Sequence, residues 1–465
     1  MSKEFLGNQP IGKLLFKLSV PTITAQLVNM LYNVVDRIYI GHLDEAGDLA
    51  LTGVGVCMPL IMLVSAFAAL ISSGGAPRAS IFMGKGDYVS AEKTMSSCFI
   101  AQIFTSVILT LILFVWHEDL LLAFGASENT IRYAADYMKI YAIGTIFVEL
   151  TLGLNAYITA QGASKVAMLT VVIGAATNIA LDPIFIYALD MGVRGAALAT
   201  VISQAISTAF VIVFLVSSHS VLRLKRSSLV FSGKLFFPAA ALGTAPFIMQ
   251  SSESVISICF NSSLLKYGGD IAVGAMTILT SVMQFAMLPL QGLAQGAQPI
   301  LSYNYGARKK DRVVETFKLL LKMSLIYSVA LWGAIMLFPE LFASIFTPDK
   351  NLIAFTAWAL RIYCACLGIF GVQIACQMTF VSLGKAGESV LVAIMRKFVL
   401  LIPLIFILPC ALSNDTLAVY LAEPIADFLA VSFTAILFIF QFKKALSSIE
   451  ISNNVNFSFH KTEKK

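Results

Sequence analysis

Long apolar runs separated by short polar connections dominate the pattern along this chain. Each run is long enough to cross a hydrocarbon core, which needs about 20 helical residues. Twelve runs can be counted, and they predict twelve transmembrane helices. Their approximate ranges are 14–40, 50–82, 95–115, 134–160, 166–188, 196–217, 236–263, 271–302, 316–338, 352–382, 389–411 and 416–441.

Composition supports the same fold class, an all-α integral membrane protein. The 465 residues are 58% hydrophobic and 12% charged, with a mean hydropathy of +0.84. Connections alternate between basic and acidic or neutral, so the positive-inside rule predicts that both termini are cytoplasmic in a cell (inner or plasma) membrane. The net charge of +6 therefore reflects loop topology, and we expect no nucleic-acid partner.

The two halves of the chain repeat each other at a displacement of 222 residues. Six identical residues recur at this displacement: Asp48 and Asp270, Pro77 and Pro299, Gly84 and Gly306, Thr94 and Thr316, Tyr141 and Tyr363, Gly162 and Gly384. Six matches in corresponding spans indicate duplication. Because each half holds an even number of spans, we expect a pseudo-twofold axis along the membrane normal and a cavity between or within the halves.

The predicted organisation is an N-lobe, a linker, a C-lobe and a tail. Their ranges are 1–217, 218–235, 236–445 and 446–465. The linker is basic and is expected on the cytoplasmic side. The tail has too little apolar material to fold and is expected to be disordered in the cytoplasm. We expect a monomer surrounded by membrane lipids.

Polar residues form one stripe along the first apolar run. At about 100° per residue its members fall within about 80° of one another on a helix. They are Thr22, Gln26, Asn29, Asn33 and Asp36. A carboxylate at bilayer depth costs roughly 2.5–3.5 kcal/mol, so Asp36 should line a water-filled cavity as a coupling-ion or substrate residue. The alternative is that Asp36 lies at the water boundary and pairs with Arg37.

A second acid lies in the fifth run. Asn178 and Asp182 are four residues apart and share a helix face. Pro183 follows and frees a backbone carbonyl one turn back, a device common beside ion sites. In the second half Asn261 replaces Asp36 and Ile402 replaces Asp182, so the cation chemistry should be concentrated in the first half.

The second half offers a candidate substrate surface. Uncharged amides and flexible thioethers suit varied, flat or cationic guests. The amides are Gln284, Gln291, Gln295 and Gln298, and the thioethers are Met276, Met283 and Met287. Glu253 is either a substrate contact or a structural hydrogen-bond partner, and these alternatives stay open. Further charged residues lie in or near spans; Arg361, Arg396 and Lys397 are expected to snorkel to the interface, and Glu149, Glu423 and Asp427 are acids without an assigned role.

The sequence offers no support for an enzymatic function. All four His fall in loops, at span ends or in the tail, and no phosphate-binding loop, dinucleotide fingerprint or nucleophile elbow is present. We therefore expect neither an enzyme nor an ATP-driven pump, and no cofactor.

Five motifs carry a resemblance to a known family. They are PTITAQLVNMLYNVVDRIYIG in the first span, APRASIFMGKGD after the second, TNIALDP in the fifth, AQPILSYNYGARKKD after the eighth and LAEPIAD in the twelfth. Together with the two six-span halves, they make the chain similar to the multidrug and toxic compound extrusion (MATE) family over nearly its whole length, most of all to its MepA-like bacterial branch.

The resemblance implies a secondary antiporter that expels organic cations and amphipathic compounds in exchange for H⁺ or Na⁺. It implies a first-half cation site at Asp36, Asn178, Asp182 and Thr200, where the ion could be Na⁺, and a second-half contribution from Glu253. Asn29, Asn33, Asn261, Met276, Met287, Gln284 and Gln291 are the remaining expected cavity residues. The chain departs from the branch that has an acid in span 10, where it has Gln373 and Gln377, and this favours first-half coupling.

Two other functions remain as alternatives. A flippase for a lipid-linked precursor should have more fixed cations facing its cavity than this chain offers. A passive channel would not need paired acids buried in one lobe. The donor set, two carboxylates with an amide and a hydroxyl, suits H⁺ and Na⁺ equally.

Overall fold

The computed structural model describes residues 5–43, 47–412 and 414–462, and side-chain environments as far as Ile449. Within these ranges the chain is helical, without strands. The first half contains α1 (Phe5–Asn8), α2 (Ile11–Gly41), α3 (Gly47–Gly84), α4 (Tyr88–Ala123), α5 (Ile131–Ala160), α6 (Ser164–Pro183), a π-helical turn (Ile184–Ala188) and α7 (Gly192–Val216). A connection with one 3-10 turn (Arg226–Ser228) leads to the second half.

The second half has the same number of spans but more breaks. It contains α8 (Gly233–Gly306), α9 (Lys310–Leu337), α10 (Pro339–Ser344), α11 (Lys350–Tyr363), a 3-10 turn (Leu367–Ile369), α12 (Phe370–Ser382), α13 (Ala386–Ile394), a π-helical stretch (Met395–Leu401), α14 (Ile402–Ala411) and α15 (Asp415–Thr462). Gly269 interrupts α8 with φ 66° and ψ −165°, a conformation open to glycine, so α8 is two spans.

Twelve spans result, as the sequence predicts. Ten helical segments of the described chain are long and apolar enough to cross a membrane. The break at Gly269 divides one of them into two. A further span is formed by α11 and α12 together, which are bent by 47° at their junction.

The duplication extends to individual hydrogen bonds. Ser80 Oγ donates to the Ala160 carbonyl at 2.8 Å, and its counterpart 222 residues later, Ser302 Oγ, donates to the Ser382 carbonyl at 2.8 Å. The turns that follow the second span of each half also match, because Gly86 and Arg308 both have positive φ, 79° and 57°. The inferred repeat is therefore confirmed at the level of backbone geometry.

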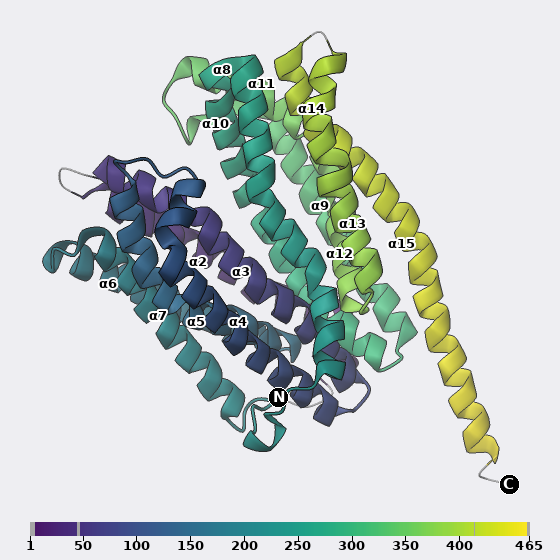
Figure 1. Ribbon diagram of the computed structural model, residues 1–465. Helices are drawn as coiled ribbons and strands as arrows, with labels where there is room; N and C mark the ends of the chain where they lie inside the picture. Colours follow the sequence, from purple (N-terminus) through teal and green to yellow (C-terminus); the bar gives the residue numbers. More distant parts are fainter. Residues whose placement is uncertain (1–4, 44–46, 413, 463–465) are drawn as a thin grey trace.

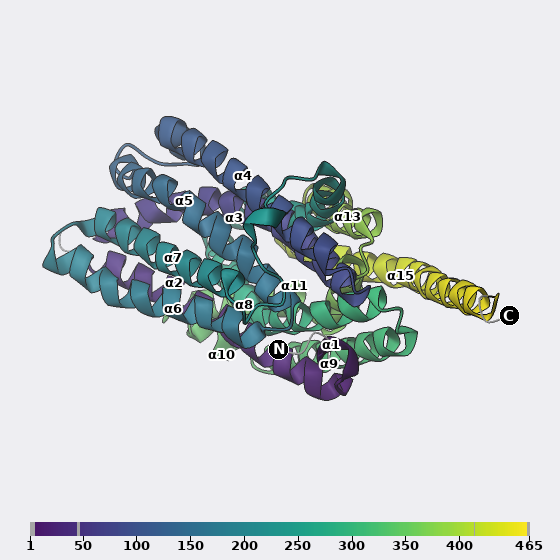
Figure 2. The same ribbon diagram turned by 90° about the horizontal axis from the view of Figure 1, so that it is seen from below.

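The two lobes share one hydrophobic core at one end of the molecule and have separate cores at the other. The shared core joins residues such as Leu14 and Met83 to Ile300 and Leu320 near the N-terminus. Farther along the spans, residues of 40–197 form one cluster and residues of 256–426 another. Figure 1 shows the same arrangement, with the lobes close together near the N-terminus and divergent toward the opposite end. From below, α1 and α9 lie beside each other at this N-terminal end (Figure 2), where Arg312 of α9 donates to the Gln9 carbonyl at 2.7 Å.

Glycines bring the lobes into backbone contact at this N-terminal end. A Cβ on Gly84 of α3 would collide with the Tyr303 carbonyl of α8, and a Cβ on Gly306 would collide with the Ile81 carbonyl. Ile81 and Tyr303 are counterparts in the repeat, as are Gly84 and Gly306, so each lobe makes the same contact with the other. Such reciprocity is the signature of a twofold relation.

The C-terminal segment differs from the prediction. Residues 446–465 were expected to be a disordered tail, but α15 continues through this segment to Thr462. The sequence between 446 and 462 contains neither Gly nor Pro, so nothing in it ends a helix that has already started in the membrane span. The location of either terminus relative to the membrane stays a prediction.

The reciprocal glycine contact gives a symmetric expectation for substitution. Gly84→Ala and Gly306→Ala should each destabilise the protein by about 1–3 kcal/mol, because each added methyl meets a carbonyl of the other lobe. Thermal unfolding of detergent-purified protein measures this effect. Gly55→Ala, at a position of α3 with nothing within 4 Å of the added Cβ, is the matched control. A large loss for one glycine and none for its counterpart would contradict the twofold contact.

Candidate functional site

Asp182 lies fully buried near the end of α6, one turn after Asn178. The Asn178 Nδ2 donates to Asp182 Oδ1 at 3.2 Å and reaches the Thr200 hydroxyl of α7 at 3.5 Å. Thr200 donates its own hydroxyl hydrogen to the Ala196 carbonyl at 3.0 Å. The structure therefore brings together three of the four residues of the predicted cation site.

Asp36 of α2 completes this group. It lies close enough to Asp182 for the two charges to repel. Arg37 attracts Asp36 electrostatically but is itself exposed, and no ion pair joins these neighbours within the described chain. Three buried acceptor atoms of this group have no hydrogen-bond partner within the described chain: Asp36 Oδ1, Asp182 Oδ2 and Asn178 Oδ1. Such a site has spare acceptors, and the described part of the chain places no buried cation against them.

Two tyrosines at this site were not anticipated from the sequence. Tyr137 of α5 hydrogen-bonds the Thr200 side chain and lies near Asp36. Tyr32 lies near Asp36 and Asp182 and hydrogen-bonds Asn33. Tyr32 could have been found, since it precedes Asp36 by four residues on the same helix face. Tyr137 gave no signal, because a tyrosine in an apolar span is as common in packing as in a site.

The inner part of the α2 stripe serves contact between the lobes. Thr22 Oγ1 donates to the Gly292 carbonyl of α8 at 2.6 Å, and Gln26 Nε2 donates to Gln295 Oε1 at 3.1 Å. Farther out, Asn33 Nδ2 donates to the Asn29 carbonyl of its own helix at 2.7 Å. The stripe therefore has two parts, one that joins the lobes and one that ends at the acid site.

The C-lobe contains a buried cluster of ion pairs. Arg396 donates to Asp427 Oδ1 at 2.7 Å and to Glu423 Oε1 at 2.9 Å, and both acids come from α15. Lys397 donates to Glu253 Oε1 of α8 at 2.7 Å. The Lys397 side chain is 5% exposed and that of Glu253 is 50% exposed. Glu253 is thus neutralised by a lysine in this structure, and this leaves its role toward substrate untested.

The expectation that Arg396 and Lys397 snorkel to the interface is wrong. Both are buried in the C-lobe because acids from α8 and α15 lie at the same depth and compensate them. They fall within the π-helical stretch Met395–Leu401, whose wider turn lies between the acids of α8 and α15. The sequence contained one usable sign, namely two cations and three acids at intramembrane positions of the second half.

The expected substrate surface is only partly exposed. Gln284, Gln291 and Asn29 are exposed, while Asn33, Asn261 and Met287 are intermediate. Met276 does not line a cavity, because it is 5% exposed and packs in the core of the C-lobe. It occupies the buried side of α8, where a long apolar side chain fills the space between spans.

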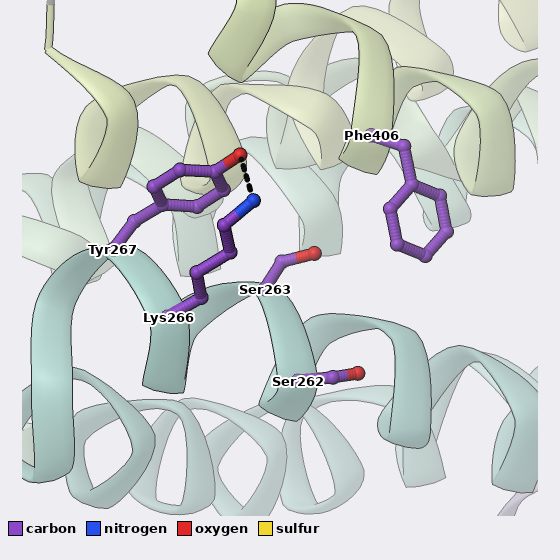
Figure 3. A pocket seen from close by; sticks show the side chains of 5 residues that line it. All are labelled: Ser262, Ser263, Lys266, Tyr267 and Phe406. Atoms are coloured by element: carbon purple, nitrogen blue, oxygen red, sulfur yellow. Dashed lines mark hydrogen bonds between the residues drawn. The ribbon is translucent and has the colours of Figure 1, made fainter.

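One small pocket lies away from this surface. It has a volume of about 190 Å³ and is lined by Ser262, Ser263, Lys266, Tyr267 and Phe406. Lys266 Nζ donates to the Tyr267 hydroxyl at 3.1 Å (Figure 3). The pocket is smaller than the roughly 300–1,000 Å³ typical of ligand sites and contains none of the predicted site residues.

The twofold architecture agrees with a family comparison. The model of the MatE family matches two stretches of similar length, residues 21–184 and 245–407, one in each half. The chain belongs to the MatE family. The resemblance drawn from the five motifs is thereby confirmed.

Relatives and solved structures extend over nearly the whole chain. The chain is 25% identical over 436 residues to multidrug export protein MepA of Staphylococcus haemolyticus (strain JCSC1435), covering 92% of this chain and 94% of that protein. It is 22% identical over 404 residues to MepA of Staphylococcus aureus (strain NCTC 8325 / PS 47), covering 87% and 88%. A crystal structure of MATE in the bent conformation superposes with a TM-score of 0.90 at 22% identity, covering 97% of this chain and 99% of that one. An outward-facing multidrug resistance MATE family transporter of the MOP superfamily gives a TM-score of 0.89, with the same identity and coverage.

The Lys397–Glu253 pair gives a prediction about stability. Glu253→Gln leaves the buried ammonium group without its partner, and removal of one partner of a buried pair costs roughly 3–5 kcal/mol. We expect a value at the lower end, since Glu253 is half exposed. The double variant Glu253→Gln/Lys397→Met should recover most of this loss. Asp136→Asn breaks the exposed pair with Arg194 and should cost less than about 1 kcal/mol.

Unfolding of the purified variants in detergent measures these differences. A double variant as unstable as Glu253→Gln alone would contradict the assignment of the loss to an uncompensated lysine.

Proposed function

We propose that this protein is a secondary active antiporter that exports organic cations and amphipathic compounds in exchange for H⁺ or Na⁺. The observation that carries the proposal is the set of buried acceptor atoms of Asp36, Asp182 and Asn178 that have no hydrogen-bond partner and no ion pair within the described chain. A charged carboxylate at this depth is stable only when a cation or a proton compensates it. The named relatives, multidrug export proteins, support the substrate class.

Repulsion between Asp36 and Asp182 supplies the coupling. With both carboxylates ionised the site repels itself, so uptake of one H⁺ or Na⁺ is favoured. Binding changes the charge of a site formed by α2, α6 and α7, and thus the relative stability of lobe arrangements in which the site is wet or dry. An ion with different affinity for two conformations shifts the population between them.

The arrangement of the lobes suits alternating access. Contact is concentrated at the N-terminal end, through Thr22 and Gln26 of α2 and the glycines of α3 and α8. If the termini are cytoplasmic, as the basic connections predict, the divergent end is extracellular and the protein is in an outward-open state. Export then requires these reciprocal contacts to open while new ones form at the other end.

Substrate recognition is proposed for the exposed amides of α8 together with Glu253. Gln284 and Gln291 offer hydrogen bonds without charge. Glu253 is half exposed, so a cationic compound could compete with Lys397 for its carboxylate. Because Glu253 lies in the other lobe, Glu253→Gln should alter which compounds are exported more than whether a gradient drives export.

Replacement of the acids tests the coupling site. Asp36→Asn keeps size and hydrogen bonding but cannot titrate, so it should abolish gradient-driven efflux at normal membrane abundance. Asp182→Asn should reduce gradient-driven efflux about as much as the double variant Asp36→Asn/Asp182→Asn. Two groups that act as one unit lose their common function when either is removed. Efflux of ethidium from proteoliposomes under separately imposed H⁺ and Na⁺ gradients is the measurement.

Full gradient-driven transport by Asp36→Asn would refute the assignment of Asp36 to the coupling site. Transport by the wild type without any gradient dependence would favour the passive channel, and movement of lipid-linked sugars in place of ethidium would favour the flippase.

The orientation of the protein has its own test. A Cys introduced at Ser227 in the linker, in a background with Cys259, Cys366 and Cys410 replaced by Ser so that the remaining native thiols are buried, should resist an impermeant thiol reagent added to intact cells, because the linker is predicted to be cytoplasmic. A Cys at Glu128, in the connection between α4 and α5, should be labelled and is the positive control. Labelling of the Ser227→Cys variant in intact cells would show that the linker is extracellular and would contradict the predicted orientation.

A further inference from the structure

Glu149 is a carboxylate that the proposed coupling site does not use. It lies on α5 with 0% exposure, and neither of its oxygens has a hydrogen-bond partner within the described chain. Gln102 of α4 is also 0% exposed, and both of its amide atoms lack partners. The Gln102 amide packs against Gly153, one turn after Glu149. Two helices thus bury an unpartnered acid and an unpartnered amide about one helical turn apart in the N-lobe interior.

Polar groups recur at every fourth residue of α5 on both sides of Glu149. They are Tyr137, Tyr141, Thr145, Glu149 and Tyr157, with the Gln102 amide filling the step at Gly153. All five are at most 3% exposed. Residues four apart on a helix are neighbours at about 5–6 Å between Cβ atoms. Successive members therefore adjoin along a path that winds around α5 by about 40° per step, and we name this path the α5 column.

The α5 column begins at the acid site. Tyr137 hydrogen-bonds Thr200 and lies near Asp36. Its ring stacks on that of Tyr141 with centroids 6.2 Å apart, and Tyr141 lies within electrostatic range of Glu149. Within the described residues, α3, α4 and α7 bring no charged side chain that acts on Glu149. Tyr141 is thus the polar group that acts on it electrostatically, and Gln102 lies one turn away, against Gly153.

The other end of the column approaches the N-terminal end of the molecule. The Tyr157 hydroxyl and the Cys98 thiol meet against Gly75 of α3. One turn along α3 lies Arg78, whose Nε is buried without a hydrogen-bond partner in the described chain. Arg78 precedes the exposed connection 85–87, where α3 gives way to α4. The column therefore connects the acid site with the surface near the N-terminus.

The second half shows that the fold does not require this column. At the displacement of 222 residues, Tyr137, Thr145 and Glu149 correspond to Ala359, Leu367 and Gly371, and Gln102 corresponds to Ser324. A Cβ on Gly371 would meet the Ser324 backbone at 2.6 Å, so in the C-lobe the two helices pack directly at this level. Tyr141 keeps a counterpart in Tyr363, but the acid and the amide are a property of the lobe that holds the acid site.

We propose that the α5 column conducts the coupling proton between the Asp36–Asp182 site and the N-terminal side, with Glu149 as the intermediate acceptor. The proposal rests on the proposed function and names its ion as H⁺. A proton leaves the protonated carboxyl group of the acid pair and passes along the hydroxyls of Tyr137, Tyr141 and Thr145, each accepting one proton as it donates another. A water molecule completes the step to Glu149, whose oxygens have no hydrogen-bond partner within the described chain. Glu149 becomes a neutral acid, the acid pair regains its charge, and Glu149 then releases the proton toward water near Arg78.

A metal cation would not follow this route. Hard cations need several oxygen ligands at once, whereas the column supplies single oxygens one helical turn apart and one carboxylate. A proton needs only one acceptor at a time, which is what each step offers.

The test uses the full chain in proteoliposomes with internal pyranine to report H⁺ and ethidium as transported dye. Glu149→Gln should bind ethidium within twofold of wild type but lose at least tenfold in H⁺-driven transport and in substrate-induced H⁺ movement. Gln102→Leu, which keeps shape without the amide, should reduce both rates several-fold. Thr151→Val is the matched control, since it removes a buried hydroxyl of α5 that bonds Thr208 at 2.7 Å, off the column.

The outcomes separate this proposal from the proposed function. Wild-type H⁺ transport by Glu149→Gln, with Asp36→Asn inactive, would overturn the column and leave the antiporter intact. Full transport by Asp36→Asn would overturn the antiporter site itself. Should Glu149→Gln fail to fold, Gln102→Leu decides, and a wild-type rate in that variant overturns the column. Transport driven by Na⁺ alone would overturn it as well.

Discussion

The cost of charge at bilayer depth governs how the two lobes differ. An ionisable side chain in a span must be paired, protonated or exposed to water. The C-lobe meets this requirement with ion pairs, since Arg396 and Lys397 compensate Glu253, Glu423 and Asp427. The N-lobe buries Asp36, Asp182 and Glu149 without a paired cation in the described chain. The charges of the C-lobe are therefore fixed in ion pairs, whereas the acids of the N-lobe need a bound proton, a bound cation or water to be stable at this depth.

The interface between the lobes shows a corresponding balance between stability and change. Helices approach closely where glycine leaves room, at Gly84 and Gly306 and where Gly292 accepts from Thr22. Contacts of this kind depend on close packing of the two backbones, because the carbonyl of one helix leaves no room for a methyl group on the other. An interface that is repeated by symmetry and made of small residues can separate as a unit. This is the property that a two-state transporter needs from its closed end.

Much of the fold was predictable, because membrane spans follow from hydrophobic length and the repeat from identical residues at one displacement. The cation site was predictable in part. Asp36 and Asp182 were found because an acid in an apolar run has few structural explanations, and Thr200 because of the family resemblance. The burial of Arg396 and Lys397 was not found, since a cation near a span end usually reaches the interface. The acids that pair with these two cations come from α8 and α15, and the spacing of residues in the sequence does not show that these helices pack against them.

Met276 and Glu149 illustrate why periodicity alone does not locate function. Met276 shares its stripe with exposed glutamines of α8, yet small differences in helix rotation place it in the core. Glu149 has no neighbour in sequence that marks it as special, and it stands out only when the fold buries both of its oxygens without a partner in the described chain and places Gln102 of α4 one turn away. Duplication produced two lobes with one backbone plan, as the matched Ser80 and Ser302 hydrogen bonds show. Because Gly371 and Ile402 now stand where the first lobe has Glu149 and Asp182, the second lobe cannot hold a labile charge at those levels. In the proposed mechanism the symmetric scaffold therefore confines the change of charge to the N-lobe, which moves against a C-lobe whose charges are paired.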